Sequence, residues 1–181
     1  MSEAKSSTSL HLYKQNFKFS AAHFLIFDAQ NAEKLHGHNY QVKVDIDFGE
    51  RAFGGLSGSD AGGAGGSSLA DSGFLIDFNV LKKFIHARLQ EWDEMVLLPA
   101  RHPEMKTEIK GSVLEVKFRD RFYAFPKNEV HLLPMTNTSV EQLSRQLAQE
   151  FFDKFKSYGV RKLTVYVEET AGQGASHEIE I

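Results

Sequence analysis

Alternating apolar and polar residues predict two neighbouring strands within the first 50 positions. In residues 10–24, and again in residues 40–48, large apolar side chains tend to occupy every second position. The apolar parity consists of Phe17, Phe19 and Ala21 in the first stretch, and of Tyr40, Val42, Val44, Ile46 and Phe48 in the second. Such alternation leaves one face of each strand buried and the other solvated, which is typical of an antiparallel sheet.

Two later stretches repeat their apolar residues at helical spacing. The first, at about residues 79–92, follows a short predicted strand at 74–78, and the second continues until Gly159. Thr138 and Glu141 have the spacing of a capping box at the start of the second helix. The apolar stripes consist of Leu81, Phe84, Ile85, Leu89 and Trp92 in the first helix and of Val140, Leu143, Leu147, Phe151 and Phe155 in the second.

The rest of the chain is rich in β-forming residues. Two apolar runs flank Arg119 and Asp120, which predicts a hairpin within residues 112–133. Residues 163–167 alternate, and a last strand ends near Ile181. The order of elements predicts an α+β fold, in which an antiparallel sheet carries two helices packed on one face.

Composition narrows the class of protein. The 181 residues have the length of one domain, and the formal net charge of −3 argues against a nucleic-acid-binding surface. The absence of cysteine excludes disulfides, thiolate metal ligands and a cysteine nucleophile. No apolar run approaches the length of a membrane span, and the first nine residues lack the core of a signal peptide, so we expect a cytoplasmic protein.

A glycine-rich segment interrupts the predicted elements at residues 51–73. It holds eight of the 14 glycines and few bulky apolar side chains, which predicts a mobile loop. It has neither the GxxxxGK[ST] pattern nor a helix directly after it, so a phosphate-binding loop is not indicated.

Three histidines form the most informative pattern in the chain. His36 and His38 are two positions apart at the start of the second predicted strand, so their imidazoles point to one face. His23 lies on the apolar parity of the first strand, and pairing of the two strands would bring all three together. Three neutral histidines with one open position commonly hold a catalytic Zn²⁺. A cupin also uses an HxH strand, but no acidic residue follows His38 before Asp45, and two capped helices fit a cupin poorly.

Two glutamates are further candidates. Glu169 continues the apolar parity of residues 163–167, so it is either a strand end open to water or a carboxylate at a pocket floor that accepts N–H donors of a ligand. Glu33, three positions before His36, is either a surface-loop residue or a general base beside a metal.

At these residues the chain resembles the 6-pyruvoyl-tetrahydropterin synthase / 6-carboxy-tetrahydropterin synthase family. The matching segments are residues 19–23, 36–40, 73–78, 137–141 and 167–170, outside the glycine-rich loop and a β-rich insertion at about 101–133. The resemblance implies a single T-fold domain over residues 1–181 that forms a trimeric β-barrel and a hexamer, with active sites between subunits. It implies zinc ligands at His23, His36 and His38, a pterin anchor at Glu169 and a hydroxyl near the pterin at Ser139.

The chain departs from the family pattern at the proton-transfer residues. The usual cysteine before the HGH is absent, and the family's Asp-His pair reads Asp93-Glu94 here. A side branch of the family carries glutamate in an ExxHGH arrangement, which Glu33 matches. Members of that branch resemble enzymes that cleave the side chain of 7,8-dihydroneopterin triphosphate.

The resemblance therefore implies a zinc-dependent lyase acting on a dihydropterin, with Glu33 as proton carrier and Asp93 as a further catalytic candidate. An alternative is a zinc- and pterin-binding paralogue with little or no synthase activity, in which the insertion remodels the pocket and His102 or His131 supplies a replacement group. A third is a metal-free structural domain. The product, whether 6-hydroxymethyl-, 6-pyruvoyl- or 6-carboxy-pterin, does not follow from the spacing.

Overall fold

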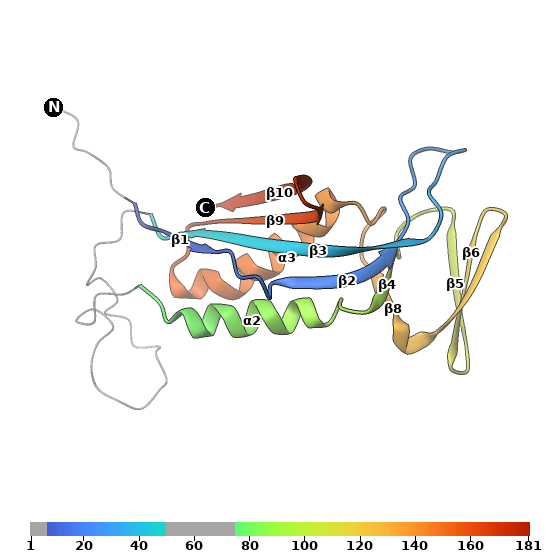
Figure 1. Ribbon diagram of the computed structural model, residues 1–181, viewed down its shortest axis with the longest axis horizontal. Coiled ribbons are helices and arrows are strands. Elements are labelled where there is room, and N and C mark those ends of the chain that lie inside the picture. Colours follow the sequence, from blue (N-terminus) through green and yellow to red (C-terminus); the bar gives the residue numbers. More distant parts are fainter. Residues whose placement is uncertain (1–6, 50–74) are drawn as a thin grey trace.

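The computed structural model describes residues 7–49 and 75–181 and contains two sheets and two α-helices (Figure 1). The glycine-rich segment predicted as a loop, and Phe74 of the predicted strand at 74–78, lie outside the described residues. The strands of the main sheet are β1 (Ser9–Leu12), β2 (Lys18–His23), β3 (His36–Asp47), β4 (Met95–Pro99), β8 (Val130–Leu133), β9 (Lys162–Thr170) and β10 (Gln173–Glu180). The helices are α2 (Phe78–Gln90) and α3 (Val140–Phe155), with short 3-10 turns at Lys127–Glu129 and Lys156–Tyr158.

The main sheet has the strand order β10-β9-β3-β2-β4-β8, and β1 also pairs with β3. Strands β1, β2, β3, β9 and β10 are antiparallel to their neighbours in this group, as predicted. The prediction of a wholly antiparallel sheet was wrong at one side, because β4 runs parallel to both β2 and β8. The chain passes from β3 through α2 to β4, and β4 runs antiparallel to β3 and therefore parallel to β2, which lies between them in the sheet.

Both helices pack on one face of this sheet, as predicted. The alternate residues of β3 and β9 that face the helices are fully buried, and they form one hydrophobic core with the inner stripes of α2 and α3. The central members of this core are Tyr40, Val42, Val44, Ile46, Leu81, Ile85, Leu89, Leu143, Leu147, Phe151, Phe155, Leu163, Val165 and Val167. Each such side chain contributes roughly 1.5–3 kcal/mol through burial, which holds the strand faces in register.

The start of each helix differs from its predicted position. The predicted strand at 74–78 was wrong over its described part, because Asp77 accepts a hydrogen bond from the amide of Asn79 (2.8 Å) and so caps α2 at Phe78. The N-cap of α3 is Ser139, whose side chain makes no capping hydrogen bond, so the predicted capping box of Thr138 and Glu141 was wrong. The Thr138 hydroxyl instead donates to the carbonyl of Phe24 (3.3 Å).

The first predicted strand is divided in two. Residues 13–17 form a turn in which the Phe17 amide donates to Lys14 (3.0 Å), so β1 and β2 pair separately with β3. The register of β2 nevertheless follows the predicted parity, and it places His23 directly opposite His36.

A second, smaller sheet stands at one end of the molecule (Figure 1). It consists of β5 (Met105–Lys110), β6 (Val113–Phe118) and β7 (Arg121–Pro126), all antiparallel, and β6 and β7 form the hairpin predicted at Arg119 and Asp120. β8 then returns to the main sheet. A separate hydrophobic core lies beneath this sheet and includes Phe24 and Ile26.

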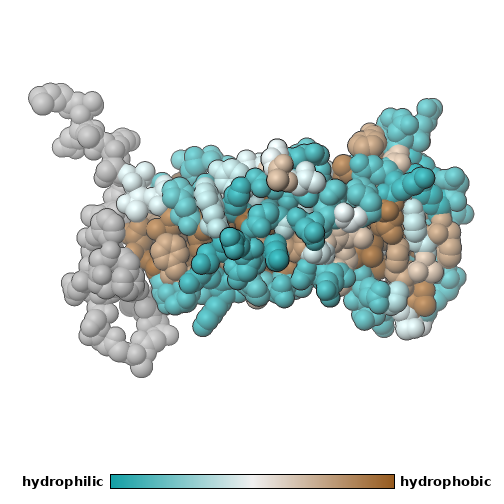
Figure 2. Space-filling model, viewed as in Figure 1, coloured by the Kyte–Doolittle hydropathy of each residue, from teal (hydrophilic) through white to brown (hydrophobic). Residues whose placement is uncertain are grey.

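The surface of the molecule is mostly hydrophilic on the face in Figure 2, with apolar residues exposed at the end that carries the small sheet. Ile109 on β5 and Phe122 on β7 are both more than half exposed. Among the described residues, no helix is long and apolar enough to cross a membrane.

Candidate metal centre

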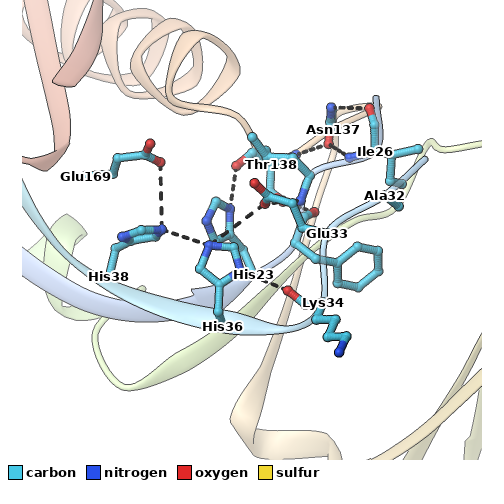
Figure 3. A network of polar contacts seen from close by, with 12 residues as sticks. His23, Ile26, Ala32, Glu33, Lys34, His36, His38, Asn137, Thr138 and Glu169 are labelled. Atoms are coloured by element: carbon cyan, nitrogen blue, oxygen red, sulfur yellow. Dashed lines mark hydrogen bonds and ion pairs between the residues drawn. The ribbon is translucent and has the colours of Figure 1, made fainter. Parts of the chain in front are cut away.

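The pairing of β2 with β3 brings the three predicted histidines together. His23 ends β2 opposite His36, which begins β3, and His38 follows on the same face. One ring nitrogen from each of the three lies within 4.8 Å of the other two. The ring centroids are 4.7–5.3 Å apart, and Figure 3 shows the rings turned toward one another. The prediction that these residues meet at one end of a strand pair is confirmed.

Backbone carbonyls orient two of the rings. Nδ1 of His23 lies 2.9 Å from the carbonyl oxygen of Thr138, and Nδ1 of His36 lies 2.8 Å from that of Lys34. Because a carbonyl only accepts, each Nδ1 carries the proton, and each Nε2 presents a lone pair to the centre of the group. A carbonyl behind a ligating histidine is the usual outer partner in metal sites.

The Nε2 atoms fit a metal ion. Nε2 of His23 is buried and has no hydrogen-bond partner among the described residues, which is costly unless another species binds it. Nε2 of His36 lies 2.9 Å from Nε2 of His38. Ligands at about 2.0–2.1 Å in a tetrahedron are about 3.3 Å apart, so small ring movements accommodate an ion of the size of zinc.

The electrostatics of His23 favour the neutral ligand form. Burial lowers the pKa of His23, and the nearby His36 and His38 lower it further, against an opposing effect of the Thr138 carbonyl. A neutral imidazole is the form that binds a metal, so burial keeps His23 ready to ligate at neutral pH.

Glu169 lies on one side of the histidines. Its Oε2 is 4.0 Å from Nε2 of His38, and its side chain is largely buried (Figure 3). The preceding Glu168 points to the opposite face, where it forms an ion pair with Lys43 (2.8 Å). The predicted parity of Glu169 is therefore confirmed. Its other oxygen accepts a hydrogen bond from Gln173 (2.6 Å).

Glu33 lies on the other side of the group. Its Oε2 accepts a hydrogen bond from the amide of Leu25 (3.0 Å) and lies 3.8 Å from Nε2 of His36. The side chain is 30% exposed, so Glu33 is partly open to solvent while its Oε2 lies near His36. Glu33 was interpreted either as a surface-loop residue or as a base beside a metal. Its place next to His36 supports the second interpretation.

The remaining predicted residues, Ser139 and Asp93, make their hydrogen bonds outside the histidine group. Ser139 follows Thr138 at the start of α3, and its hydroxyl donates to the Glu141 carboxylate, which lowers the pKa of Glu141. Asp93 accepts a hydrogen bond from the amide of Ser20 on β2 (2.7 Å). Within the described ranges, Asp93 has no polar contact with the three histidines.

The two histidines considered as replacement groups lie elsewhere. His102 packs against Phe118 of the small sheet, and His131 on β8 lies among charged groups that include Arg88 of α2. Neither joins the candidate metal group among the described residues.

Several contributing residues were not predicted. Asn137 bonds both backbone groups of Ile26 (2.9 and 3.2 Å), and Thr138 supplies the carbonyl behind His23. The carbonyl of Thr138 carries no side-chain signal, and only the match of residues 137–141 to the family pattern pointed to this segment. Tyr40, two positions after His38, is wholly buried, and the sequence indicated only that it belongs to the core.

Comparison with known proteins identifies the family. The family model described as 6-pyruvoyl tetrahydropterin synthase matches residues 12–180. A putative 6-carboxy-5,6,7,8-tetrahydropterin synthase of Methanocaldococcus jannaschii is 30% identical over 163 residues, which cover 88% of each chain. A 6-carboxy-5,6,7,8-tetrahydropterin synthase of Bacillus subtilis is 33% identical over 85 residues, covering 46% of this chain and 45% of the relative.

Solved structures share the fold. The 6-pyruvoyl tetrahydropterin synthase of Plasmodium falciparum superposes with a TM-score of 0.79 at 24% identity, covering 97% of this chain and 99% of that chain. A variant of the Plasmodium vivax enzyme, described as a catalytic residue mutant in which glutamate is replaced by cysteine, superposes with a TM-score of 0.78 at 22% identity and the same coverage. The predicted T-fold is therefore confirmed, and the chain belongs to the 6-pyruvoyl tetrahydropterin synthase family.

Proposed function

We propose that this protein is a zinc-dependent lyase acting on a dihydropterin such as 7,8-dihydroneopterin triphosphate. The observation that carries the proposal is the convergence of three histidine nitrogens flanked by two carboxylates. Glu33 lies 3.8 Å from His36 on one side, and Glu169 lies 4.0 Å from His38 on the other. The reaction is either cleavage of the pterin side chain or an elimination from it.

In this proposal His23, His36 and His38 hold Zn²⁺. Three imidazoles and no thiolate are a ligand set that zinc accepts in catalytic sites. A bound zinc ion supplies a Lewis acid that polarises a hydroxyl of the substrate side chain. The carbonyls of Thr138 and Lys34 hold two of the rings in the ligating tautomer.

Glu33 carries the proton in this scheme. Its Oε2 is held by the Leu25 amide, so the carboxylate stays beside His36 instead of turning into solvent. The chain has no cysteine that could do this work. The P. vivax enzyme described with a glutamate as its catalytic residue supports a carboxylate in such a role.

Glu169 anchors the pterin ring. A carboxylate accepts two parallel N–H bonds, which matches the amino-pyrimidine edge of a pterin. The side chain is only 12% exposed, so a ligand that pairs with it gains from restricted competition with water. We assign Ser139 to the margin of the same pocket and Asp93 to a secondary role.

The proposal includes a homo-oligomer, a trimer or hexamer with sites between subunits, located in the cytoplasm. The main sheet supports this assembly because it ends in β10, which pairs on one side only among the described strands. An unpaired edge of this kind is suited to pairing with another copy of the chain.

A second candidate function is a zinc- and pterin-binding paralogue without synthase activity. Its support is the place of Asp93, which bonds the backbone of Ser20 and is followed by Glu94 instead of the family's histidine. Without that histidine, proton transfer depends on Glu33 alone.

Turnover and metal content test the proposal together. The purified protein is incubated with zinc and 7,8-dihydroneopterin triphosphate, and the products are separated by chromatography. We expect a pterin product, loss of turnover in Glu33→Gln with zinc retained, and loss of zinc in His36→Ala. Glu108→Gln, the same change at a glutamate that is 69% exposed on β5, serves as the control.

Each contrary result has a defined meaning. Full turnover in Glu33→Gln removes the proton-carrier role. No turnover in the wild type, with a pterin still raising the melting temperature, favours the binding paralogue. A purified protein that takes up no zinc refutes both.

A further inference from the structure

The loop that carries Glu33 is attached to the small sheet. Residues 24–35 join β2 to β3, and Phe24 and Ile26 at the start of this loop are buried in the core of that sheet. They pack with Leu114, Val116 and Phe118 of β6. The position of the loop therefore depends on a sheet that contributes no residue to the histidine group.

Arg121, the first residue of β7, contacts the loop at Glu33 itself. Its guanidinium donates from Nη1 to the carbonyl oxygen of Glu33 and from Nη2 to that of Ala32 (3.0 Å). Two bonds from one planar group to consecutive carbonyls fix the orientation of both peptide planes next to the Glu33 side chain. The bonds are partly buried, so water competes with them only in part.

A second arginine bonds the same loop near its middle, at Asp28. Nη2 of Arg119 donates to the carbonyl oxygen of Asp28 (2.6 Å) while the same guanidinium pairs with Glu104 (2.6 Å). Both arginines also lie over the ring of Phe118, at 4.6 and 5.9 Å from its centroid. The hairpin of β6 and β7 is thus hydrogen-bonded to the loop at two separate points.

The position of the Glu33 carboxylate depends on these hydrogen bonds. The Glu33 amide donates to the Leu25 carbonyl (2.9 Å), and the Leu25 amide donates back to the Glu33 carboxylate (3.0 Å). This closed pair sets the side chain beside His36 only if the backbone of Glu33 keeps its orientation. Arg121 is the side chain that bonds that backbone from the small sheet.

We propose that Arg121 is a positioning residue for catalysis, and that the small sheet serves to hold Glu33 at its distance from the histidines. The inference rests on the proposed role of Glu33. A misplacement of a reacting group by about 1 Å can lower the rate by about 100-fold. Arg121 therefore acts through Glu33 and contacts no substrate.

Kinetics of Arg121→Ala test the proposal. We expect kcat for the dihydropterin substrate to fall about 10- to 100-fold with KM within about twofold and zinc content unchanged. Arg121→Lys keeps the charge but cannot bond both carbonyls, so its loss is intermediate. Lys117→Ala removes a charge from the exposed face of the same sheet and serves as the matched control.

A double-mutant cycle separates positioning from a general loss of structure. If Arg121 acts through Glu33, Arg121→Ala causes no further loss of kcat in a Glu33→Gln background. An equal loss in both backgrounds would overturn the proposal, as would wild-type kcat in Arg121→Ala. If Arg121→Ala fails to fold, Arg121→Lys is measured in its place.

Amide hydrogen exchange gives a readout independent of turnover. The Leu25 amide bonds the Glu33 carboxylate, so its protection should fall in Arg121→Ala and stay unchanged in Lys117→Ala. Unchanged protection in Arg121→Ala would overturn the positioning role even if Glu33→Gln abolishes turnover. Conversely, lost protection with full turnover in Glu33→Gln would refute the role of Glu33 in the proposed function, and not the contact made by Arg121.

Discussion

Tyr40 offers a test of the packing beneath the histidines. Its ring stacks on Phe19 with centroids 4.6 Å apart and meets the rings of His23 and His38 edge-on. The side chain is wholly buried, and its hydroxyl has no hydrogen-bond partner among the described residues. Burial, followed by the charges of Glu169 and Glu33, raises the pKa of Tyr40. The phenol is therefore neutral, and Tyr40→Phe removes a hydroxyl without removing a charge.

We expect Tyr40→Phe to stabilise the protein. A buried hydroxyl without a partner costs about 1–3 kcal/mol of desolvation, which the substitution recovers. The space left by one oxygen, roughly 15 Å³, costs about 0.4 kcal/mol at ~24 cal/mol per Å³. The net gain is about 0.6–2.6 kcal/mol. For a chain of this length, each kcal/mol corresponds to a Tm change of about 2–4 °C.

The assay is thermal unfolding of both proteins, with saturating zinc and again with chelator. Tyr123→Phe is the control, because Tyr123 on β7 is half-buried and its hydroxyl is not among the buried unpaired atoms of the described chain. Its Tm should change by no more than the shift that corresponds to a free-energy difference of about 0.5 kcal/mol. A fall in Tm for Tyr40→Phe in both conditions would show that the hydroxyl is hydrogen-bonded in the folded protein, and the argument would be refuted.

Three further outcomes follow from the structure. If zinc binds as proposed, chelation should remove about 2.7 kcal/mol of stability relative to zinc at 100 times its Kd, and a variant without His36 should show no such difference by calorimetry. The hydrogen bond to Asp45 (2.7 Å) raises the pKa of Tyr13 to about 12, so that bond stabilises the fold below pH 10 and is lost as the pH rises through about 12. Asp45→Asn should return the pKa of Tyr13 toward 10 in an absorbance titration at 295 nm, and an unchanged titration would contradict this. Gly174→Ala would place a Cβ 2.3 Å from the carbonyl oxygen of Val167, so Tm should fall by an amount that corresponds to about 1–3 kcal/mol, whereas an unchanged Tm would mean that the β-bulge yields freely.

The histidine group could be predicted from the sequence because the position of a residue in a strand determines the face on which its side chain lies. A period of two assigns each residue of a strand to one face, so His36, His38 and Glu169 could be placed on the buried side without coordinates. His23 required one added assumption, that the two strands pair, and the register of β2 with β3 confirms it. The helices were similarly indicated by their apolar stripes, which the core reproduces.

Other features depend on contacts between distant segments. The direction of β4 could not be predicted, because it depends on which strand the chain pairs with when it returns after α2, and no local pattern records that choice. Residues 74–78 are apolar enough for a strand, but Asp77 caps a helix instead, and local propensity does not distinguish these outcomes in so short a run.

The surroundings of Glu33 could not be predicted from the sequence either. Whether Glu33 is a surface residue or faces a metal ligand depends on Arg121, which is 88 positions away along the chain. An arginine that bonds backbone carbonyls leaves no periodic trace in the sequence. The site could therefore be predicted where it rests on strands and not where it rests on loops.

The direct pairing of His23 with His36 also bears on the order in which the chain folds. About a dozen residues separate the two, and closing such a loop costs about 2 kcal/mol of length-dependent entropy. Glu169 and the carbonyl of Thr138 come from segments that are more than 100 positions away from these ligands. The three histidines can thus meet in a local hairpin before the C-terminal half arrives. If the histidines bind a metal as proposed, its capture and the arrival of Glu169 are separable events during folding, and only the second requires the C-terminal half of the chain.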